Sequence, residues 1–355
     1  MNNKAAKSKD GNLEVRYNDV THVCVASNIY PFLQYFLLMD DDVAFHHTYY
    51  FFNDTLPKGV IDRLPCSMYK YKNRSIKDKI LKRINKIRLR FFKNRIFPFL
   101  KNAEIFAYDI PYLSLCIGKR PYNLLADAPN WVTLLCQDHS HEHIRIIRHA
   151  NSFIGKLEGL FFGDLYIHYH GQNSQCKAFY LTEENTAPVL QGKEVHINSM
   201  SSLWNQASDA KKRFIMESFD IKREDMEFLS SKPNMFFSQP LDVFGLSEKE
   251  CVSVLETIFQ NYPYDSLIVK AHPRDKFDYK KHFPSISLFT KPINSQLLYI
   301  LGLKPKKVIT ICSTAIEAFP ETIECDYYGT HIHPKIEKST DNFYKPFREV
   351  HFMNN

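Results

Sequence analysis

Short apolar runs alternate with helix-like segments through the second half of the chain, and this alternation constrains the fold more than any other feature. Runs such as 266–271 (SLIVKA) and 307–312 (KVITIC) are mostly apolar along their length, as expected for strands buried on both faces of a parallel sheet. Parallel strands need crossover helices, so the pattern predicts a doubly wound α/β domain. The expected strands are 234–239, 266–271, 286–291, 307–312 and 322–329, and the expected helices are 248–262, 295–302 and 313–319.

The first half carries the same alternation in weaker form, so two domains are expected, in keeping with a length of 355 residues. A polar stretch at 207–232 has the composition of the joint between them. We therefore predict a flexible N-terminus (1–20), an N-terminal domain (21–230), a C-terminal domain (231–340) and a C-terminal tail (341–355). The strands expected in the first half are 21–27, 46–52, 103–110 and 178–183, and the helices are 30–39 and 143–160.

Composition narrows the classes of ligand. Only 11 residues are glycine, and none forms the G-x-G-x-x-G or G-x-x-x-x-G-K pattern, which excludes the common glycine-rich phosphate cradles. The formal charge of +7 (46 Lys and Arg against 39 Asp and Glu) favours anionic partners. The eight cysteines include no C-x-x-C pair, and the N-terminus has no apolar signal core. We therefore expect free thiols in a reducing compartment, with the protein in the cytoplasm.

Polar residues follow three of the strands predicted in the second half, and the ends of parallel strands meet at one edge of a sheet. His272, Pro273 and Arg274 come directly after the run 266–271, within which Lys270 adds a further cation. A histidine with an ordinary pKa of about 6.5 can donate a proton or a hydrogen bond to a phosphate oxygen. A surface turn without a ligand is the alternative.

Two further strand ends carry hydroxyl and amide groups. Ser313 and Thr314 follow the run 307–312 at the start of an expected helix, while Gln239 and Pro240 follow the run that begins at 234. Hydroxyls beside the N–H groups of a helix N-terminus can hold an anion, although either hydroxyl alone can be a plain helix cap. The three strand ends together favour a phosphate-binding cleft.

A pair of carboxylates, Glu183 and Glu184, ends the strand 178–183 and is followed by Asn185. Neighbouring side chains at a strand end alternate sides, so one carboxylate can serve as a general base while the other faces solvent. A solvated acidic turn is the alternative.

A basic segment at 70–101 carries 13 Lys and Arg residues and one acid, Asp78. Its isoleucines recur at helical spacing, which predicts an amphipathic basic helix over 75–97. Such helices bind anionic lipid headgroups, so an anionic membrane surface is a candidate partner. A core-packed helix with a solvated basic face is the alternative. The segment matches no nucleic-acid-binding module, and nucleic acid is not expected as a partner.

Histidines cluster at 139, 141 and 143 and again at 168 and 170. They lack a cysteine partner and the H-E-x-x-H spacing, so no metal site is predicted from them.

Taken in order, the motifs resemble those of a known enzyme family. They are Glu183-Glu184-Asn185 after a strand, Ser-Gln-Pro-Leu at 238–241, Lys-Ala-His-Pro-Arg at 270–274 and Cys-Ser-Thr at 312–314. The sequence resembles bacterial sialyltransferases of glycosyltransferase family 52, the lipooligosaccharide sialyltransferases, with the bacterial polysialyltransferases as relatives. It departs from the family pattern at Asn185, where glycine is usual, and at 312–314, where a pair of serines is usual.

The resemblance implies a GT-B-like fold of two Rossmann-like, doubly wound domains with a cleft between them. It also implies inverting transfer of sialic acid from CMP-sialic acid to a hydroxyl of an acceptor glycan, such as the terminal galactose of lipooligosaccharide or capsule. No cofactor or metal is required in such enzymes. A CMP-Kdo-dependent Kdo transferase and a non-catalytic anion- or membrane-binding protein are the alternatives.

Residue roles follow from the same resemblance. Glu183, with Glu184 as the alternative, becomes the base that deprotonates the acceptor, and His272 becomes the acid or phosphate stabiliser for departing CMP. Ser27 and Asn28 lie on the acceptor side, which is the N-terminal domain. The donor-binding residues of the C-terminal domain are Lys270, Pro273, Arg274, Ser313, Thr314, Gln239 and Pro240. The expected partners are the CMP-sugar donor, a glycan or glycolipid acceptor, the inner face of the membrane through 75–97, and a second copy of the chain in a homodimer.

Overall fold

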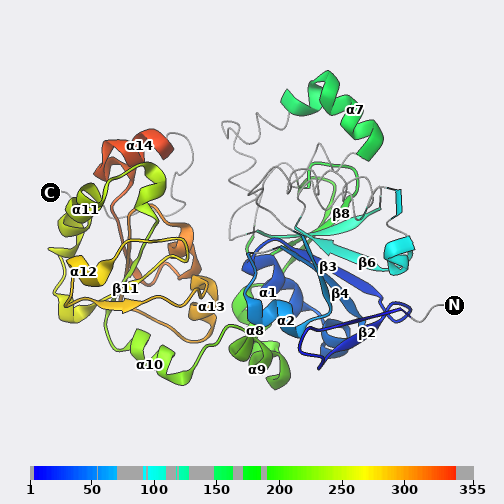
Figure 1. Cartoon of the computed structure of the whole chain (residues 1–355), viewed down its shortest axis with the longest axis horizontal. Helices are drawn as coiled ribbons and strands as arrows, with labels where there is room; N and C mark the ends of the chain where they lie inside the picture. Colours follow the sequence, from blue (N-terminus) through cyan, green and yellow to red (C-terminus); the bar gives the residue numbers. More distant parts are fainter. Residues whose placement is uncertain are drawn as a thin grey trace. The chain divides into compact units, whose positions relative to one another are not determined.

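The computed structural model describes residues 4–53, 55–69, 91–92, 95–108, 117, 120–127, 148–162, 171–184 and 190–340. The chain divides into two compact units, Met1–Asp220 (unit 1) and Ile221–Asn355 (unit 2), and each is an α/β unit built around its own parallel sheet (Figure 1). The predicted basic helix lies outside the described residues except at 91–92 and 95–97, and so does the predicted tail 341–355.

The main sheet of unit 1 has seven strands in the order β5-β4-β3-β6-β7-β8-β9, and all neighbouring pairs are parallel. The chain starts in the middle at β3, moves outward to β5 and returns on the other side of β3 at β6. The strand order therefore reverses between β3 and β6, the point where open α/β sheets bind ligands beyond the strand ends. The strands are β3 (His22–Ala26), β4 (Thr48–Asn53), β5 (Cys66–Tyr69), β6 (Glu104–Ala107), β7 (Tyr122–Leu125), β8 (Cys176–Leu181) and β9 (Glu194–Ile197).

Aromatic side chains fill the layer between this sheet and α1 (Ile29–Leu38), a helix that is buried along most of its length. The ring of Phe32 meets that of Phe52 edge-on at 5.6 Å between centroids, and Tyr35 packs on Tyr50 in the same way. All six residues of β4 are buried, as expected for a parallel strand covered on both faces. The other helices of unit 1 include α2 (Lys58–Arg63), α7 (Phe153–Phe162), α8 (Met200–Gln206) and α9 (Asp209–Ser218), with a π-helix at Val43–His47 and a 3₁₀ helix at Pro98–Lys101.

The first twenty residues, predicted to be flexible, instead hold an antiparallel hairpin of β1 (Ala5–Lys7) and β2 (Glu14–Arg16). Two contacts explain the order. Val15 is buried, and the hydroxyl of Ser8 closes the turn by accepting from Leu13 N at 3.0 Å. Val15 is the one buried apolar residue of the two hairpin strands, which is a weak sequence signal, so the hairpin was not predicted.

The predicted joint at 207–232 holds two helices, α9 and α10 (Arg223–Ser230), and its polar residues lie mainly on their solvent-facing sides. The division between the units falls between these helices at Asp220, earlier than the predicted boundary at 230. Helix α10 belongs to unit 2 because Asp225 pairs with Lys291 at 2.6 Å and Phe228 stacks on Phe289.

Helix α7 exposes large apolar side chains. Phe153, Ile154 and Leu160 are 76%, 64% and 69% exposed. Figure 1 shows the helix standing away from the strands of unit 1. It forms the later part of the helix predicted at 143–160, of which 143–147 lies outside the described residues. In the part of the chain that the structure describes, no helix combines the length and apolarity needed to cross a bilayer.

The sheet of unit 2 has five parallel strands in the order β12-β11-β10-β13-β14, so its order reverses between β10 and β13. The strands are β10 (Asn234–Phe237), β11 (Leu267–Lys270), β12 (Ser287–Phe289), β13 (Lys307–Thr310) and β14 (Glu324–Tyr327), and they fall within the five predicted runs. The helices are α11 (Glu248–Phe259), α12 (Tyr279–His282), α13 (Ser295–Ile300) and α14 (Pro334–Thr340), with 3₁₀ helices at Leu241–Phe244, Tyr264–Ser266, Thr314–Ala318 and Thr330–Ile332.

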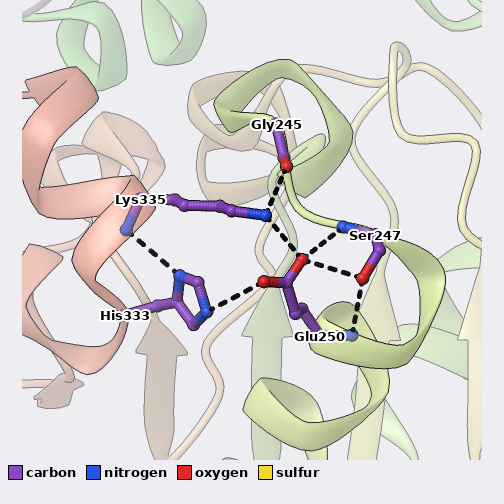
Figure 2. Close-up of polar contacts among 5 residues, drawn as sticks. All are labelled: Gly245, Ser247, Glu250, His333 and Lys335. Carbon is purple, nitrogen blue, oxygen red and sulfur yellow. Dashed lines mark hydrogen bonds and ion pairs between the residues drawn. The ribbon is translucent and has the colours of Figure 1, made fainter.

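One carboxylate ties the last described helix, α14, to α11 (Figure 2). Glu250 forms a capping box with Ser247, whose backbone N donates to the Glu250 carboxylate at 2.7 Å. Lys335 Nζ donates to the same carboxylate at 2.8 Å and to the carbonyl of Gly245 at 3.1 Å. These bonds, the one from Lys335 first, lower the pKa of Glu250 to about 2. Helix α14 is thereby fixed to the start of α11.

Candidate active site

The strand ends singled out in unit 2 emerge side by side. Strand β10 pairs with β11 on one side and β13 on the other, with Phe237 level with both Lys270 and Thr310. The residues that follow, Gln239, His272 and Ser313, therefore leave the sheet at one carboxyl edge. This edge includes the reversal of strand order between β10 and β13, where the topology places ligands.

A buried hydroxyl fixes the turn that carries His272. Ser238 Oγ accepts from His272 N at 2.9 Å and donates to Asp275 Oδ2 at 2.5 Å. Tyr279 OH donates to the same Asp275 oxygen at 2.9 Å, and Asp275 N closes the turn onto the carbonyl of His272 at 2.8 Å. The backbone at His272 is thus held from two sides.

The imidazole of His272 has a defined tautomer. Its Nδ1 accepts from Arg274 N at 3.1 Å, so in the neutral ring the proton lies on Nε2. Burial, followed by the charges of Arg274 and Lys270, lowers the pKa of His272 to about 4. At neutral pH the ring is therefore an uncharged Nε2–H donor, and an anion bound against it would raise the pKa again.

The neighbours of His272 divide into buried and exposed groups. Lys270 is 3% exposed, and its Nζ turns back to donate to the carbonyl of Ala271 at 3.0 Å. Burial lowers the pKa of Lys270 to about 8. Pro273 and Arg274 are exposed, so the Arg274 side chain can reach an anion at this edge while Lys270 contributes its charge from within.

At the reversal of strand order, an amide and a thiol meet. Gln239 Oε1 accepts from both the backbone N and the Sγ of Cys312, each at 3.0 Å. Burial raises the pKa of the Cys312 thiol to about 11. Pro240 follows as the first residue of the turn into the 3₁₀ helix Leu241–Phe244.

Ser313 is a cap, one of the two roles that the sequence left open. Its Oγ accepts from Ala315 N at 3.2 Å at the start of Thr314–Ala318. That element is a five-residue 3₁₀ helix, shorter than the helix predicted at 313–319, so its dipole is small. The cap uses the oxygen as acceptor and leaves the hydroxyl proton able to meet an anion. The side chain of Thr314 lies outside the described part of the chain.

The carboxyl edge of unit 1 gathers groups from distant parts of the chain. Asn28 caps α1 through its Oδ1, which accepts from Tyr30 N at 2.8 Å, and its Nδ2 donates to Asp127 beyond β7. Ser27 is buried, and its carbonyl accepts from the hydroxyl of Thr55. The two residues predicted on the acceptor side therefore lie at the reversal of strand order between β3 and β6.

Glu183 and Glu184 follow β8, and both side chains are exposed. The residue before them, Thr182, is buried and shares a hydrogen bond of 2.5 Å with Tyr30 OH. The strand end is anchored up to Thr182, and the two exposed residues follow directly after it. Asn185, which completes the motif, lies outside the described residues.

Sequence reasoning missed the role of three residues at these edges, Asp127, Ser238 and Asp275. Asp127 carried only a weak signal, because it comes two residues after 122–125, a short run that Asn123 interrupts. Ser238 stood inside a quoted motif and Asp275 directly follows another, but their contact joins residues 37 positions apart and only the fold reveals it.

No group of three or more His, Cys, Asp or Glu side chains with the geometry to hold a metal occurs among the described residues. The histidines at 139, 141, 143, 168 and 170 lie outside them.

The fold of the chain, with its two doubly wound units, is similar to that of solved GT-B enzymes. The chain resembles the GT-B domain of a sialyltransferase from Photobacterium damselae, with a TM-score of 0.54 and 13% identity over 90% of this chain and 96% of that one. It also resembles a 2,6-sialyltransferase from Photobacterium sp. JT-ISH-224, solved with CMP and lactose, with a TM-score of 0.55 and 12% identity over 93% of this chain and 78% of that one. At these identities the likeness shows the fold.

The chain belongs to glycosyltransferase family 52, whose family model matches residues 145–336, more than half of its 355 residues. An uncharacterised protein of Haemophilus influenzae is 34% identical over 168 residues, which are 47% of this chain and 54% of that protein. The chain thus spans about half the length of this relative.

Proposed function

We propose that this protein is a sialyltransferase that moves sialic acid from CMP-sialic acid to a hydroxyl of an acceptor glycan, with inversion at the anomeric carbon. The observation that carries the proposal is the carboxyl edge of unit 2, where His272, Gln239 and Ser313 leave three adjacent strands in a chain of family 52. The similar fold of an enzyme solved with CMP and lactose supports a CMP-sugar donor and a galactose-containing acceptor.

The donor end of the reaction needs charge stabilisation more than covalent chemistry. CMP leaves as a phosphate, and the Nε2–H of His272 can donate to that phosphate as its negative charge grows. Arg274 and the hydroxyl of Ser313 are further candidates for the same anion. The turn held by Ser238 and Asp275 keeps the His272 backbone fixed, which lowers the reorganisation needed during the reaction.

The acceptor end needs a base to remove the proton of the attacking hydroxyl. The carboxyl edge of unit 1 carries the residues proposed for it, Glu183 or Glu184 beyond β8, with Ser27 and Asn28 on the acceptor side. The reaction as proposed requires no metal and no cofactor besides the donor.

The test is CMP release from CMP-sialic acid and from CMP-Kdo, measured in parallel with and without lactose. Release from CMP-sialic acid that lactose accelerates would support the proposal, and the sialylated product would give the linkage. Release from CMP-Kdo alone would show that the protein is a Kdo transferase instead of a sialyltransferase. Release from neither donor, with no thermal stabilisation by CMP, would overturn the enzymatic assignment and leave a non-catalytic binding protein.

An anionic membrane surface at the inner face of the membrane is the proposed docking partner, with the protein in the cytoplasm. Two features support it: the 13 basic residues of segment 70–101 and the exposed apolar side chains of α7. Basic charge and apolar insertion are the two contributions to interfacial binding.

A further inference from the structure

Helix α1 carries a buried phenol that reaches the end of the strand bearing the acidic pair. The hydroxyl of Tyr30 shares a hydrogen bond of 2.5 Å with the hydroxyl of Thr182, and both residues are buried. Thr182 comes directly before Glu183, and it is separated from Tyr30 by 152 positions in the sequence. The residue that precedes the acidic pair is therefore held by a side chain of another element.

A second side chain of α1 holds the same strand one turn further along the helix. Gln34 is buried, its Nε2 donates to the carbonyl of Tyr180 at 2.8 Å, and its Oε1 accepts from Ala126 N at 2.9 Å. Residues four apart lie on one face of a helix, so Tyr30 and Gln34 contact the end of β8 from the same face of α1. Two buried side chains of one helix thus hold the last residues of β8.

The charge of Glu183 acts on the phenol of Tyr30. Burial raises the pKa of Tyr30, and the negative charge of Glu183 raises it further, against the lowering effect of the bond with Thr182. The phenol is therefore neutral at neutral pH, and its hydroxyl remains able to bond to Thr182. Because the interaction between charges weakens with distance, the effect of Glu183 places its carboxylate near the phenol.

The same helix carries a second buried Tyr–Thr pair at the opposite edge of the sheet. Tyr35 OH bonds to Thr48 Oγ1 at 2.7 Å, and both residues are fully buried. Thr48 is the first residue of β4, whereas Thr182 follows the last residue of β8, and the strands of this sheet are parallel. Of these two pairs, the one that contains Tyr30 adjoins the proposed base.

We infer that Tyr30 is a positioning residue for the general base and acts through Thr182, an assignment that rests on the sialyltransferase function and on the base role of Glu183 proposed above. A base is effective when its carboxylate lies at hydrogen-bond distance from the hydroxyl whose proton it removes. A displacement of about 1 Å at a reacting group can slow a reaction by roughly 10²-fold. Tyr30 increases kcat by fixing the backbone from which the Glu183 side chain extends.

The experiment compares Tyr30→Phe with the matched control Tyr35→Phe, each in the full chain. Both variants remove one buried hydroxyl from α1 and keep the ring, so urea unfolding should show a loss of stability in each. Lactose-dependent CMP release from CMP-sialic acid gives kcat and the KM for lactose. For Tyr30→Phe we expect kcat to fall by about tenfold, with this KM and the thermal stabilisation by CMP unchanged. Tyr35→Phe should keep its kcat within a few-fold of the unmodified protein.

Variants of Thr182 test whether Tyr30 acts through that residue. Thr182→Val removes the hydroxyl and keeps the shape of the side chain, so it should lower kcat as much as Tyr30→Phe does. Thr182→Ser keeps the hydroxyl, so its kcat should stay within a few-fold of that of the unmodified protein. The double variant with Tyr30→Phe and Thr182→Val should lose no more than either single variant, because both substitutions remove the same bond.

Equal kcat values in Tyr30→Phe and Tyr35→Phe would show that the bond of Tyr30 is purely structural, and transfer by the unmodified protein would leave the proposed function standing. Additive losses in the double variant would rule out action through Thr182. No transfer by the unmodified protein would overturn both proposals together. If Tyr30→Phe fails to fold, the Thr182 variants decide. A kcat lowered in Thr182→Val but not in Thr182→Ser would support the assignment, and equal values in the two would refute it.

Discussion

The two units assemble their polar edges in different ways. In unit 2 the contacts at the edge join Ser238 with His272 and Asp275 at separations of 34 and 37 residues, and Gln239 with Cys312 at a separation of 73. In unit 1 Asn28 meets Asp127 across 99 residues, and Tyr30 meets Thr182 across 152. The contacts at the edge of unit 2 therefore span shorter stretches of the chain than those at the edge of unit 1.

The most direct test of this comparison is a substitution of His272 at the edge of unit 2, where the largest effect is expected. Replacing His272 with alanine removes the Nε2–H donor proposed for the leaving phosphate, so turnover should fall by about 10²- to 10⁴-fold. Lactose-dependent CMP release measures the loss, and thermal stabilisation by CMP checks that the donor still binds. Turnover within a few-fold of normal would remove His272 from the reaction.

A smaller effect is expected when the turn is loosened and the ring is kept. Ser238→Ala deletes the hydroxyl that accepts from His272 N and donates to Asp275, and two lost buried hydrogen bonds should cost about 1–3 kcal/mol of unfolding free energy. We expect kcat to drop by about tenfold, with little change in the KM for lactose.

The matched control is Ser266→Ala, which removes a hydroxyl bonded to Asn234 at the opposite edge of the same sheet. It should lose some stability, as measured by urea unfolding, and keep its kcat. Equal losses of kcat in the two variants would mean that Ser238 acts only through stability.

The contributions of His272 and Asp127 to the free energy of unfolding should change with pH in opposite directions. His272 has a pKa lowered to about 4, so its neutral form is favoured in the folded state. Its contribution to stability is complete above its ordinary pKa of about 6.5 and is lost as the pH falls towards 4. Urea unfolding should show the unmodified protein losing more stability than His272→Gln between pH 7 and pH 4. If the unfolding free energies of the two proteins changed in parallel with pH, the predicted contribution of His272 would be wrong.

At Asp127 the sign reverses, because burial raises the pKa to about 6. The protonated form is favoured in the folded state, so the contribution is present below about pH 3.8 and is lost as the pH rises through 6. Relative to the unmodified protein, Asp127→Asn should gain on the order of 2 kcal/mol of unfolding free energy between pH 4 and pH 7.5. Urea unfolding midpoints of the two proteins across that range test this prediction. A relative loss of stability in Asp127→Asn as the pH rises would show that the ionised Asp127 stabilises the fold.

The smallest effect on turnover is expected in the basic segment 70–101. Neutralising Lys82, Arg83, Lys86 and Arg90 with glutamine should weaken sedimentation with vesicles that contain anionic lipid and leave lactose-dependent CMP release unchanged. Vesicles of neutral lipid are the control.

Unchanged binding to anionic vesicles would return the basic segment to a solvated structural role. Concentration-dependent dimerisation that buries α7 would point to a second copy of the chain as its partner.

The same contrast explains what the sequence could predict. The strands of unit 2 were predictable because β11 and β13 are short buried apolar runs bounded by polar turns, and the alternation with helices gives the doubly wound topology. The family motifs at 270–274 and 312–314 then fell at the strand ends by simple counting.

Unit 1 was less predictable because the residues at its carboxyl edge are far apart in the sequence. Strand β7 is four residues long, and its Asn123 breaks the apolar run, so the strand and the carboxylate beyond it, Asp127, were not predicted. Glu183 and Glu184 drew attention as a pair, but their exposure became visible only in the fold. The contacts that distinguish Asp127 come from Asn28 and Tyr108, which follow β3 and β6 in the fold.

Cys312 adds a kinetic property to the edge of unit 2. Its sulfur is buried, bonded to Gln239 and kept as a thiol by its raised pKa, so a thiol-specific reagent reacts with it only after the strand end opens. The rate of labelling therefore reports how often the edge opens. Labelling of Cys312 therefore measures the local opening rate of the surface proposed to bind the donor.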